Sequence, residues 1–316
     1  MARLTACSTL GYSLSSLEVA LKHISGCGFE RVDIAEMLSH SKHFPIDSVD
    51  PAEVRRLLDK YSLEPIAANI TLATYYTGQT GLLRAPFRQG SSAETEDIQK
   101  AKANRVYYRL HLKNEAALYA ARARRLIDKA KNAGIPMVVL NVGRKEHTED
   151  IDRDLKASAA VLDSQAEYAQ ELGIKILLEM PHVWQIYYDV ERSKQMLSNL
   201  RSDNIGVVVD STHWHVSGYD IDDYVQVLQD RLWHVRLRDA AGHDSPAANY
   251  ELEKTPGKGF VDFKLLGESL DKYGYYGDVT LETEYKNYKD PSEVDAENIS
   301  AIAYLKSVGW QISVKR

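Results

Sequence analysis

The chain has 316 residues, of which 44% are hydrophobic, and a formal net charge of −6. This length is normal for one α/β barrel, and the lack of a basic block argues against a nucleic-acid partner. No apolar run reaches the roughly 18 residues of a membrane span, and the start of the chain has no apolar stretch of signal-peptide length. Cys7 and Cys27 are the only cysteines and form no Cys-x-x-Cys pair, so we expect a cytoplasmic protein without disulfides.

Short apolar runs alternate with longer amphipathic segments along the chain. We expect strands at 4–7, 31–34, 65–70, 137–142, 174–180, 205–210, 232–237 and 278–282. We expect helices at 15–27, 51–61, 115–133, 154–172, 190–199, 220–230 and 263–273. Because strands that alternate with helices form parallel β-α units, eight units in about 300 residues favour a closed (β/α)8 barrel, or TIM barrel. The sequence therefore predicts a single α/β domain over 1–316.

An open doubly wound sheet is the main alternative to this barrel. Such a sheet usually carries a Gly-x-Gly-x-x-Gly turn after its first strand, but here the chain has Ser-Thr-Leu-Gly-Tyr-Ser at 8–13. The irregular region is 71–101, which we interpret as a long loop over the barrel mouth. A surface insertion without function is the alternative interpretation of this region.

Acids and histidines gather at the C-terminal ends of the last four predicted strands, where barrel enzymes have their active sites. In chain order they include Glu179, His182, Asp210, His213, Glu282 and Glu284. Converging carboxylates repel one another unless a cation lies between them. Oxygen-rich ligation with one imidazole suits Mn²⁺ first, with Mg²⁺, Co²⁺ or Zn²⁺ as alternatives. The competing interpretation is that each acid caps a helix or pairs with a lysine.

We expect Glu179, Asp210 and Glu282 to bind this divalent metal. His213 follows Asp210 by three residues, so it can bind either the metal or a substrate. Glu284 has the same parity on its strand as Glu282 and either contacts substrate or pairs with Lys286.

Four motifs occur in a fixed order in the second half of the chain. They are Leu-Glu at 178–179, Asp-x-x-His at 210–213, Pro-Gly-Lys-Gly-Phe-Val-Asp at 256–262, and Gly-Tyr-Tyr-Gly-Asp-Val-Thr-Leu-Glu-Thr-Glu at 274–284. With them the chain resembles the xylose-isomerase-like TIM barrel superfamily, the sugar phosphate isomerase/epimerase family. The resemblance implies four metal ligands, Glu, Asp, His and Glu, from strands five to eight.

Three of these ligands match residues of this chain, and the fourth does not. Glu179, Asp210 and Glu282 match, but the position of the ligand histidine holds Arg236, and a guanidinium cannot bind a cation. Either His234 or His213 serves instead, or the metal site is altered or lost. We favour a retained metal with His213 or His234 as a ligand.

The resemblance also implies an activity on a small carbohydrate. We expect a divalent-metal-dependent isomerase or epimerase that acts on a ketose or keto-sugar through a cis-enediolate. Glu179 and Glu282 would transfer the proton. His182, His213, Arg236, Arg238 and Glu284 would bind the substrate. No phosphate site is evident, which favours a free sugar or a glycoside, and barrels of this kind can form homo-oligomers.

Other functions remain open at the level of the sequence. A metal-dependent lyase, either a dehydratase or the large subunit of a C-glycoside deglycosidase, would use the same enolate, and the latter would need a small partner subunit. Arg236 favours this alternative, because the resemblance implies a histidine at this position in ordinary epimerases. A non-catalytic sugar-binding barrel is another possibility. An endonuclease IV-like function is disfavoured by the acidic balance and the sparse histidines.

Overall fold

A computed structural model of the chain describes residues 2–36, 41–70, 72, 74–76, 105–242 and 251–315. Of the irregular region predicted at 71–101, only residues 72 and 74–76 belong to this described part. The expectation of a loop over the barrel mouth therefore falls almost entirely outside the described residues.

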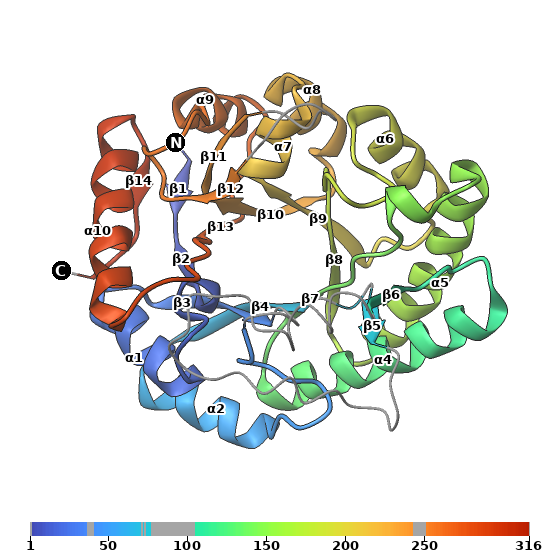
Figure 1. The fold of residues 1–316 in the computed structure, drawn as a ribbon, viewed down its shortest axis with the longest axis horizontal. Coiled ribbons are helices and arrows are strands. Elements are labelled where there is room, and N and C mark those ends of the chain that lie inside the picture. Colours follow the sequence, from blue (N-terminus) through green and yellow to red (C-terminus); the bar gives the residue numbers. More distant parts are fainter. Residues whose placement is uncertain are drawn as a thin grey trace.

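Eight parallel strands form a closed barrel in the order β10-β13-β2-β3-β4-β7-β8-β9. Figure 1 shows these strands as an inner ring and the helices as an outer ring. The strands are β2 (Ala6–Ser8), β3 (Arg31–Glu36), β4 (Glu64–Ile70), β7 (Met137–Val139), β8 (Lys175–Glu179), β9 (Ile205–Asp210), β10 (Leu232–Leu237) and β13 (Asp278–Leu281). All eight predicted strands are present, which confirms the single TIM barrel.

The helices that cover the barrel follow the predicted amphipathic segments, with one addition near the C-terminus. They are α1 (Leu17–Gly26), α2 (Pro51–Lys60), α4 (Lys113–Ala133), α5 (Ile151–Glu171), α6 (Val190–Asn199), α8 (Ile221–Leu228), α9 (Phe263–Lys272) and α10 (Pro291–Ser307). None of the described helices is both long and apolar enough to cross a membrane.

Aspartates cap many of these helices, so helix capping accounts for a distinct group of the acids in the chain. In each case the side chain precedes the helix and accepts a hydrogen bond from a backbone N–H of its first turn. The caps are Asp50, Asp150, Asp189, Asp220, Asp262 and Asp290. Since a capping side chain satisfies an otherwise unpaired donor, it stabilises its helix by about 1 kcal/mol.

Two α-helices of the described part of the chain were not predicted from the sequence. α7 (Ser211–Ser217) begins directly after β9, and Asp210 accepts hydrogen bonds from the N–H groups of Thr212 and His213. This helix is too short to show a period. The start of α10 could have been predicted from the sequence, because Pro291 follows the capping Asp290 and Glu293 completes a capping box.

Short ladders lie outside the barrel. β1 (Arg3–Leu4) pairs with β14 (Gln311–Ile312), β5 (Thr74–Tyr76) with β6 (Arg105–Tyr107), and β11 (Asp239–Ala241) with β12 (Glu251–Lys254). The β1 and β14 pair joins the two ends of the described chain. The ladders therefore add connections at the ends and edges of the barrel without changing its strand order.

The barrel has one apolar core between its strands and helices and a smaller one inside the strands. The inner core includes Leu177 of β8 and Val208 of β9. Side chains of a strand alternate between its two faces, so Glu179 and Asp210, two residues further along, point to the same side as these apolar residues. The charged side chains of Glu179 and Asp210 therefore lie next to the apolar inner core, at its C-terminal end.

Candidate active site

Three predicted acids meet inside the C-terminal end of the barrel. Glu179 ends β8, Asp210 ends β9, and Glu282 directly follows β13. All three are buried, and one carboxylate oxygen of each lies within 4.8 Å of the others. The structure therefore brings together the acids that the sequence assigned to one site.

Arg236 of β10 extends its guanidinium among these carboxylates. Its Nε donates a hydrogen bond to Oδ2 of Asp33 at 3.0 Å, and its Nη2 is 2.9 Å from the same oxygen. Nε is also 3.6 Å from Oε2 of Glu282, and Nη1 is 3.9 Å from Oε1 of Glu179. Burial opposes the charge on Arg236, but Asp33, Glu282 and Glu179 outweigh it and raise the pKa of Arg236. The arginine thus keeps its positive charge in a buried position.

Asp33 was missed in the sequence. It lies in β3 and is fully buried, and its pKa is raised to about 6, first by burial, against the lowering effect of Arg236. The available signal was an acid placed between the apolar Val32 and Ile34 of this strand. What it pairs with depends on β10, about 200 positions away in the chain, and the sequence does not show that contact.

A second arginine, Arg238, holds the acid at the end of β9. Its Nε donates to Oδ2 of Asp210 at 2.8 Å and its Nη1 donates to Oε2 of Glu284 at 3.0 Å. The other oxygen of Asp210 accepts from both the N–H and the hydroxyl of Thr212. Glu284 also lies 3.2 Å from Nζ of Lys286, the pairing considered for it in the sequence. Both oxygens of Asp210 are therefore engaged by protein donors.

Glu282 differs from an ordinary glutamate in its affinity for a proton. Burial, together with the negative charges of Asp33 and Glu179, raises the pKa of Glu282 to about 8, although Arg236 and Arg238 act in the opposite direction. The amide of Asn69 in β4 donates to Oε1 of Glu282 at 2.8 Å. Near neutral pH this side chain can therefore hold a proton and donate it.

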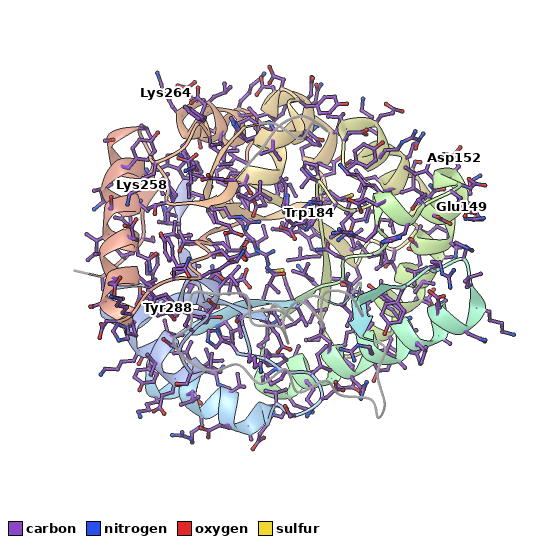
Figure 2. All side chains as sticks on the ribbon, in the orientation of Figure 1. Glu149, Asp152, Trp184, Lys258, Lys264 and Tyr288 are labelled. Carbon is purple, nitrogen blue, oxygen red and sulfur yellow. The ribbon has the colours of Figure 1, made fainter. Side chains whose placement is uncertain are left out.

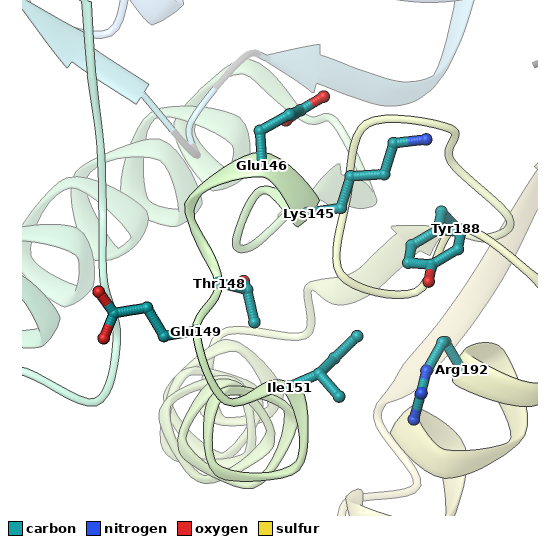
Figure 3. Close-up of a pocket in the computed structure, with 7 residues that line it drawn as sticks. All are labelled: Lys145, Glu146, Thr148, Glu149, Ile151, Tyr188 and Arg192. Carbon is teal, nitrogen blue, oxygen red and sulfur yellow. The ribbon is translucent and has the colours of Figure 1, made fainter. Parts of the chain in front are cut away.

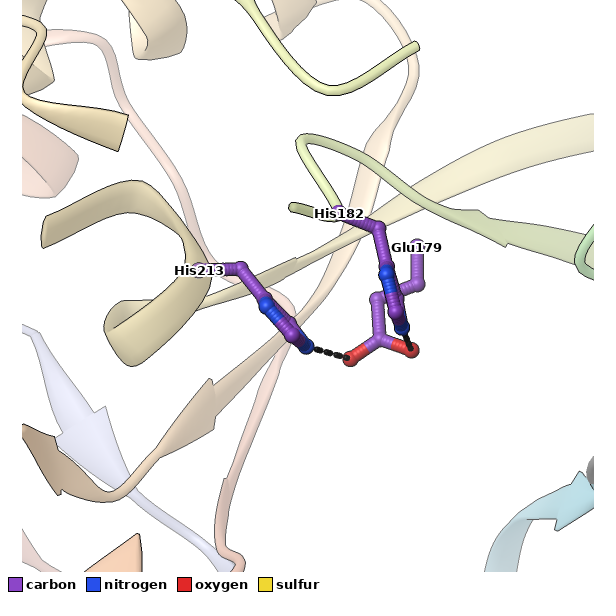
Figure 4. Close-up of side chains that lie close together, drawn as sticks. All are labelled: Glu179, His182 and His213. Atoms are coloured by element: carbon purple, nitrogen blue, oxygen red, sulfur yellow. Dashed lines mark ion pairs between the residues drawn. The ribbon is translucent and has the colours of Figure 1, made fainter. Parts of the chain in front are cut away.

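On the other side of Glu179 lie two histidines. The rings of His182 and His213 are stacked, with centroids 4.0 Å apart and planes at 28°. As Figure 4 shows, their Nε2 atoms point at the two oxygens of Glu179, at 3.7 and 3.8 Å. Burial lowers the pKa of His182 to about 3 and that of His213 well below its usual value, with Arg238 contributing to both. Both imidazoles are therefore neutral, which is the form that binds metals.

His234, the other histidine predicted as a ligand, lies apart from these groups. It is fully buried in β10, two residues before Arg236, and its Nε2 hydrogen-bonds the hydroxyl of Thr280 in β13 at 2.8 Å. Neither cluster of potential metal ligands among the described residues includes it. Arg236, two residues further along β10, is the side chain of this strand that approaches the carboxylates of Glu179 and Glu282.

Two sets of side chains can be tested as a place for a divalent metal. Glu179, Asp210 and Glu282 form the first, and an ion among them would face the guanidinium of Arg236 at close range. Glu179, His182 and His213 form the second and offer one carboxylate and two neutral imidazoles. Arg238 Nη2 lies 3.3 Å from Nε2 of His213, which identifies that nitrogen as the one with a lone pair. The second set has the better ligand types for a cation, but Nε2 of His213 would have to give up the hydrogen bond from Arg238. Nε2 of His182 would have to lose its proton, because Nδ1 of that ring accepts from the N–H of Trp184.

Asn141, which follows β7, positions Glu179. Its Nδ2 donates to Oε2 of Glu179 at 3.1 Å, and its Oδ1 accepts from the backbone N–H of Glu179 and from the hydroxyl of Tyr187. Asn69 likewise donates to the carboxylate of Glu282. A search of the sequence for amides at the ends of strands three and four would have found both asparagines.

An aromatic side chain lies beside the two histidines. The ring centroid of Trp184 is 5.6 Å from the rings of both His182 and His213. Figure 2 labels Trp184 among the side chains near the middle of the barrel. Such a flat apolar face suits the C–H face of a sugar.

A surface cavity of about 430 Å³ lies elsewhere, at the start of α5, and none of the predicted site residues lines it. Figure 3 shows its lining, which comes from the segment before α5, the first residue of α5, and the segment around the start of α6. The residues are Lys145, Glu146, Thr148, Glu149, Ile151, Tyr188 and Arg192.

A closed parallel barrel with acids, histidines and arginines at the C-terminal strand ends is the architecture of TIM-barrel enzymes. The model of one such family matches residues 21–307 of the chain. The chain belongs to the xylose isomerase-like TIM barrel family. This finding confirms the family resemblance derived from the motifs.

Individual relatives agree with this family at low identity. The chain is 26% identical to an inosose isomerase of Bacillus subtilis (strain 168) over 161 residues, which cover 50% of this chain and 57% of that protein. It thus spans little more than half the length of this curated relative. Among solved structures, the IOLI protein with a bound zinc atom is similar at a TM-score of 0.72 and 18% identity, covering 97% of this chain and 98% of that one. A D-tagatose 3-epimerase-like protein has a TM-score of 0.66 and 19% identity, with 97% and 99% covered.

Proposed function

We propose that the chain is a sugar isomerase or epimerase that moves a proton on a ketose or keto-sugar through a cis-enediolate. The observation that carries the proposal is the pair Glu179 and Glu282, two buried glutamates on either side of the Arg236 guanidinium. The inosose isomerase among the relatives and the epimerase-like protein among the similar structures support the same class of reaction.

The two glutamates have different roles in this proposal. Glu179, held by Asn141, accepts the proton from the carbon next to the substrate carbonyl, and the electron pair of the broken C–H bond forms the enediolate. Glu282, whose pKa of about 8 keeps it protonated near neutral pH, returns a proton to the other face or to the neighbouring carbon. The substrate loses one proton and gains one, and proton exchange with solvent then returns Glu179 and Glu282 to their starting protonation states.

A divalent metal bound by Glu179, His182 and His213 would supply a Lewis acid that polarises the substrate carbonyl. Mn²⁺ stays the predicted ion, and the two imidazoles in this set make Zn²⁺ an equally suitable probe.

The other side chains orient the substrate. Arg236 and Arg238 present N–H donors to its oxygens, and Glu284 and the two histidines accept from or donate to its hydroxyls. Trp184 offers an apolar face beside them. The proposed substrate is therefore a small, polar carbohydrate with a carbonyl.

Solvent exchange tests the proposal. Purified protein, with and without Mn²⁺ or Zn²⁺, is incubated in D₂O with a panel of ketoses and 3-keto-glycosides, and deuterium uptake and products are followed by NMR. We expect deuterium at the carbon next to the carbonyl, together with the epimer or isomer. Absence of uptake across the panel with the metal-loaded protein would contradict the proposal.

A lyase is the second candidate, because the protonated Glu282 could serve that reaction as well. A neutral carboxylic acid next to an enolate can protonate a leaving group at the β position, and the bond to that group then breaks. The same experiment separates the two candidates, because the lyase gives an eliminated fragment. A dependence of that reaction on an added small subunit would point to the C-glycoside deglycosidase type.

A further inference from the structure

Arg236 is the largest of the fully buried side chains in the described part of the protein. A buried guanidinium is tolerated only where negative groups compensate it. Here three acids surround it, Asp33 at 2.9 Å, Glu282 at 3.6 Å and Glu179 at 3.9 Å, and Asp33 is the one in direct hydrogen-bond contact. These three acids and Arg236 are called the arginine cluster below.

Within the arginine cluster, Asp33 fixes the guanidinium from across the barrel. Nε and Nη2 of Arg236 both approach Oδ2 of Asp33. Among the residues that the structure describes, no atom accepts a hydrogen bond from Nη1 of Arg236, which points toward Glu179. One side of the guanidinium is therefore anchored, and the other has a donor available for an oxygen of a ligand.

A guanidinium and a divalent ion cannot share these acids. Arginine stays protonated in proteins and has no lone pair, so it contributes charge but no coordination. Its charge is paired with Asp33 and lies close to Glu179, and it repels a second cation placed between Glu179 and Glu282. Asp210 is engaged separately, by Arg238 and Thr212. All three carboxylates of the strand-end set are thus occupied by cationic or N–H and O–H donors of the chain.

We propose that Arg236 takes the place of a metal ion in the arginine cluster, excludes divalent ions from the space among Glu179, Asp210 and Glu282, and itself binds the negative oxygen that forms on the substrate. The last part rests on the proposed function, whereas the exclusion of metal does not. Among the ligand clusters of the described residues, the one left for a divalent ion is then Glu179 with His182 and His213.

Metal binding tests the exclusion directly. Wild-type protein and variants are dialysed against Mn²⁺ or Zn²⁺, and bound metal is counted by elemental analysis and titrated by calorimetry. Glu282→Gln should leave the metal content and affinity of the wild type unchanged. Arg236→His should gain an ion at least about tenfold more tightly bound than any in the wild type, and the double variant with Glu282→Gln should lose it.

Arg236→Gln is a second variant that removes the charge and keeps an amide donor for Asp33, and it should also gain metal. Circular dichroism identifies the variants that fold. Loss of wild-type metal on Glu282→Gln would overturn the exclusion, and so would folded Arg236→His and Arg236→Gln proteins that bind no more metal than the wild type. These results do not depend on turnover, so failure of the proposed function would be recognised separately, in the solvent-exchange experiment.

Discussion

Glu179 has charged neighbours on one side and neutral neighbours on the other. On the first side Arg236 lies 3.9 Å from Oε1, within a group that also contains Asp33 and Glu282. On the second side the uncharged rings of His182 and His213 lie 3.7 and 3.8 Å from its two oxygens. The first side has its cation built into the chain, whereas the second side has two imidazoles, one of which accepts a hydrogen bond from Arg238. The groups that surround a carboxylate therefore decide whether a metal can bind to it.

The largest effect is expected at the residue that both sides share. Glu179→Gln should lower the rate of proton exchange by about 10²- to 10⁴-fold, because the amide cannot accept the proton. The measurement is deuterium uptake by NMR under saturating substrate. Near-normal uptake in a folded variant would remove Glu179 from the role of base.

On the charged side, Arg236→Met should destabilise the protein by about 3 to 5 kcal/mol, because it leaves buried carboxylates without a partner. Urea denaturation measures the free energy of unfolding. Arg56→Met is the matched control, since Arg56 pairs with Glu53 on the surface with more than half of its side chain exposed. That control should change stability by less than about 1 kcal/mol. Equal effects of the two substitutions would show that the arginine cluster is not the compensated charge group described here.

The raised pKa of Glu282 predicts a pH profile. The proton is held below a pH of about 8 and lost above it, so a step that needs this acid slows as the pH rises through about 8. We expect kcat/KM to fall about tenfold for each further pH unit, as for a single ionisation. A rate that stays flat from pH 7 to pH 10 would mean that Glu282 is not the proton donor.

The smallest effect is expected for acids outside the site. Asp50 caps α2 and is exposed, so Asp50→Ala should cost about 1 kcal/mol of stability and leave kcat unchanged. Thermal denaturation and the exchange assay check the two parts. A marked loss of activity in this variant would contradict the distinction between acids that cap helices and acids that meet inside the barrel.

The sequence predicted the strands of the barrel because each combines an apolar run with a helix that follows it. It also predicted that Glu179, Asp210 and Glu282 converge, since equivalent strand ends meet at one rim. It did not predict Asp33, Asn69 or Asn141, because these residues lie on or just after earlier strands, outside the group of acids and histidines at the ends of the last four strands.

The sequence also could not separate the two sides of Glu179. Arg236 and His234 have the same parity on β10, but which of them reaches the carboxylates depends on depth in the barrel and on Asp33 of β3. The stacking of His182 on His213 depends on the turn after β8 and on α7, neither of which has a periodic signal. Long-range contacts of this kind follow from packing, not from spacing along the chain.

Solvent exchange in Glu282→Gln tests the division of labour between the two glutamates most directly. With substrate in D₂O, this variant should still exchange the proton next to the carbonyl, because Glu179 can remove it and return a deuteron to the same position. It should not form the epimer or isomer, because the second proton donor is gone. Conversion at the wild-type rate, or complete loss of exchange in a folded variant, would contradict the account.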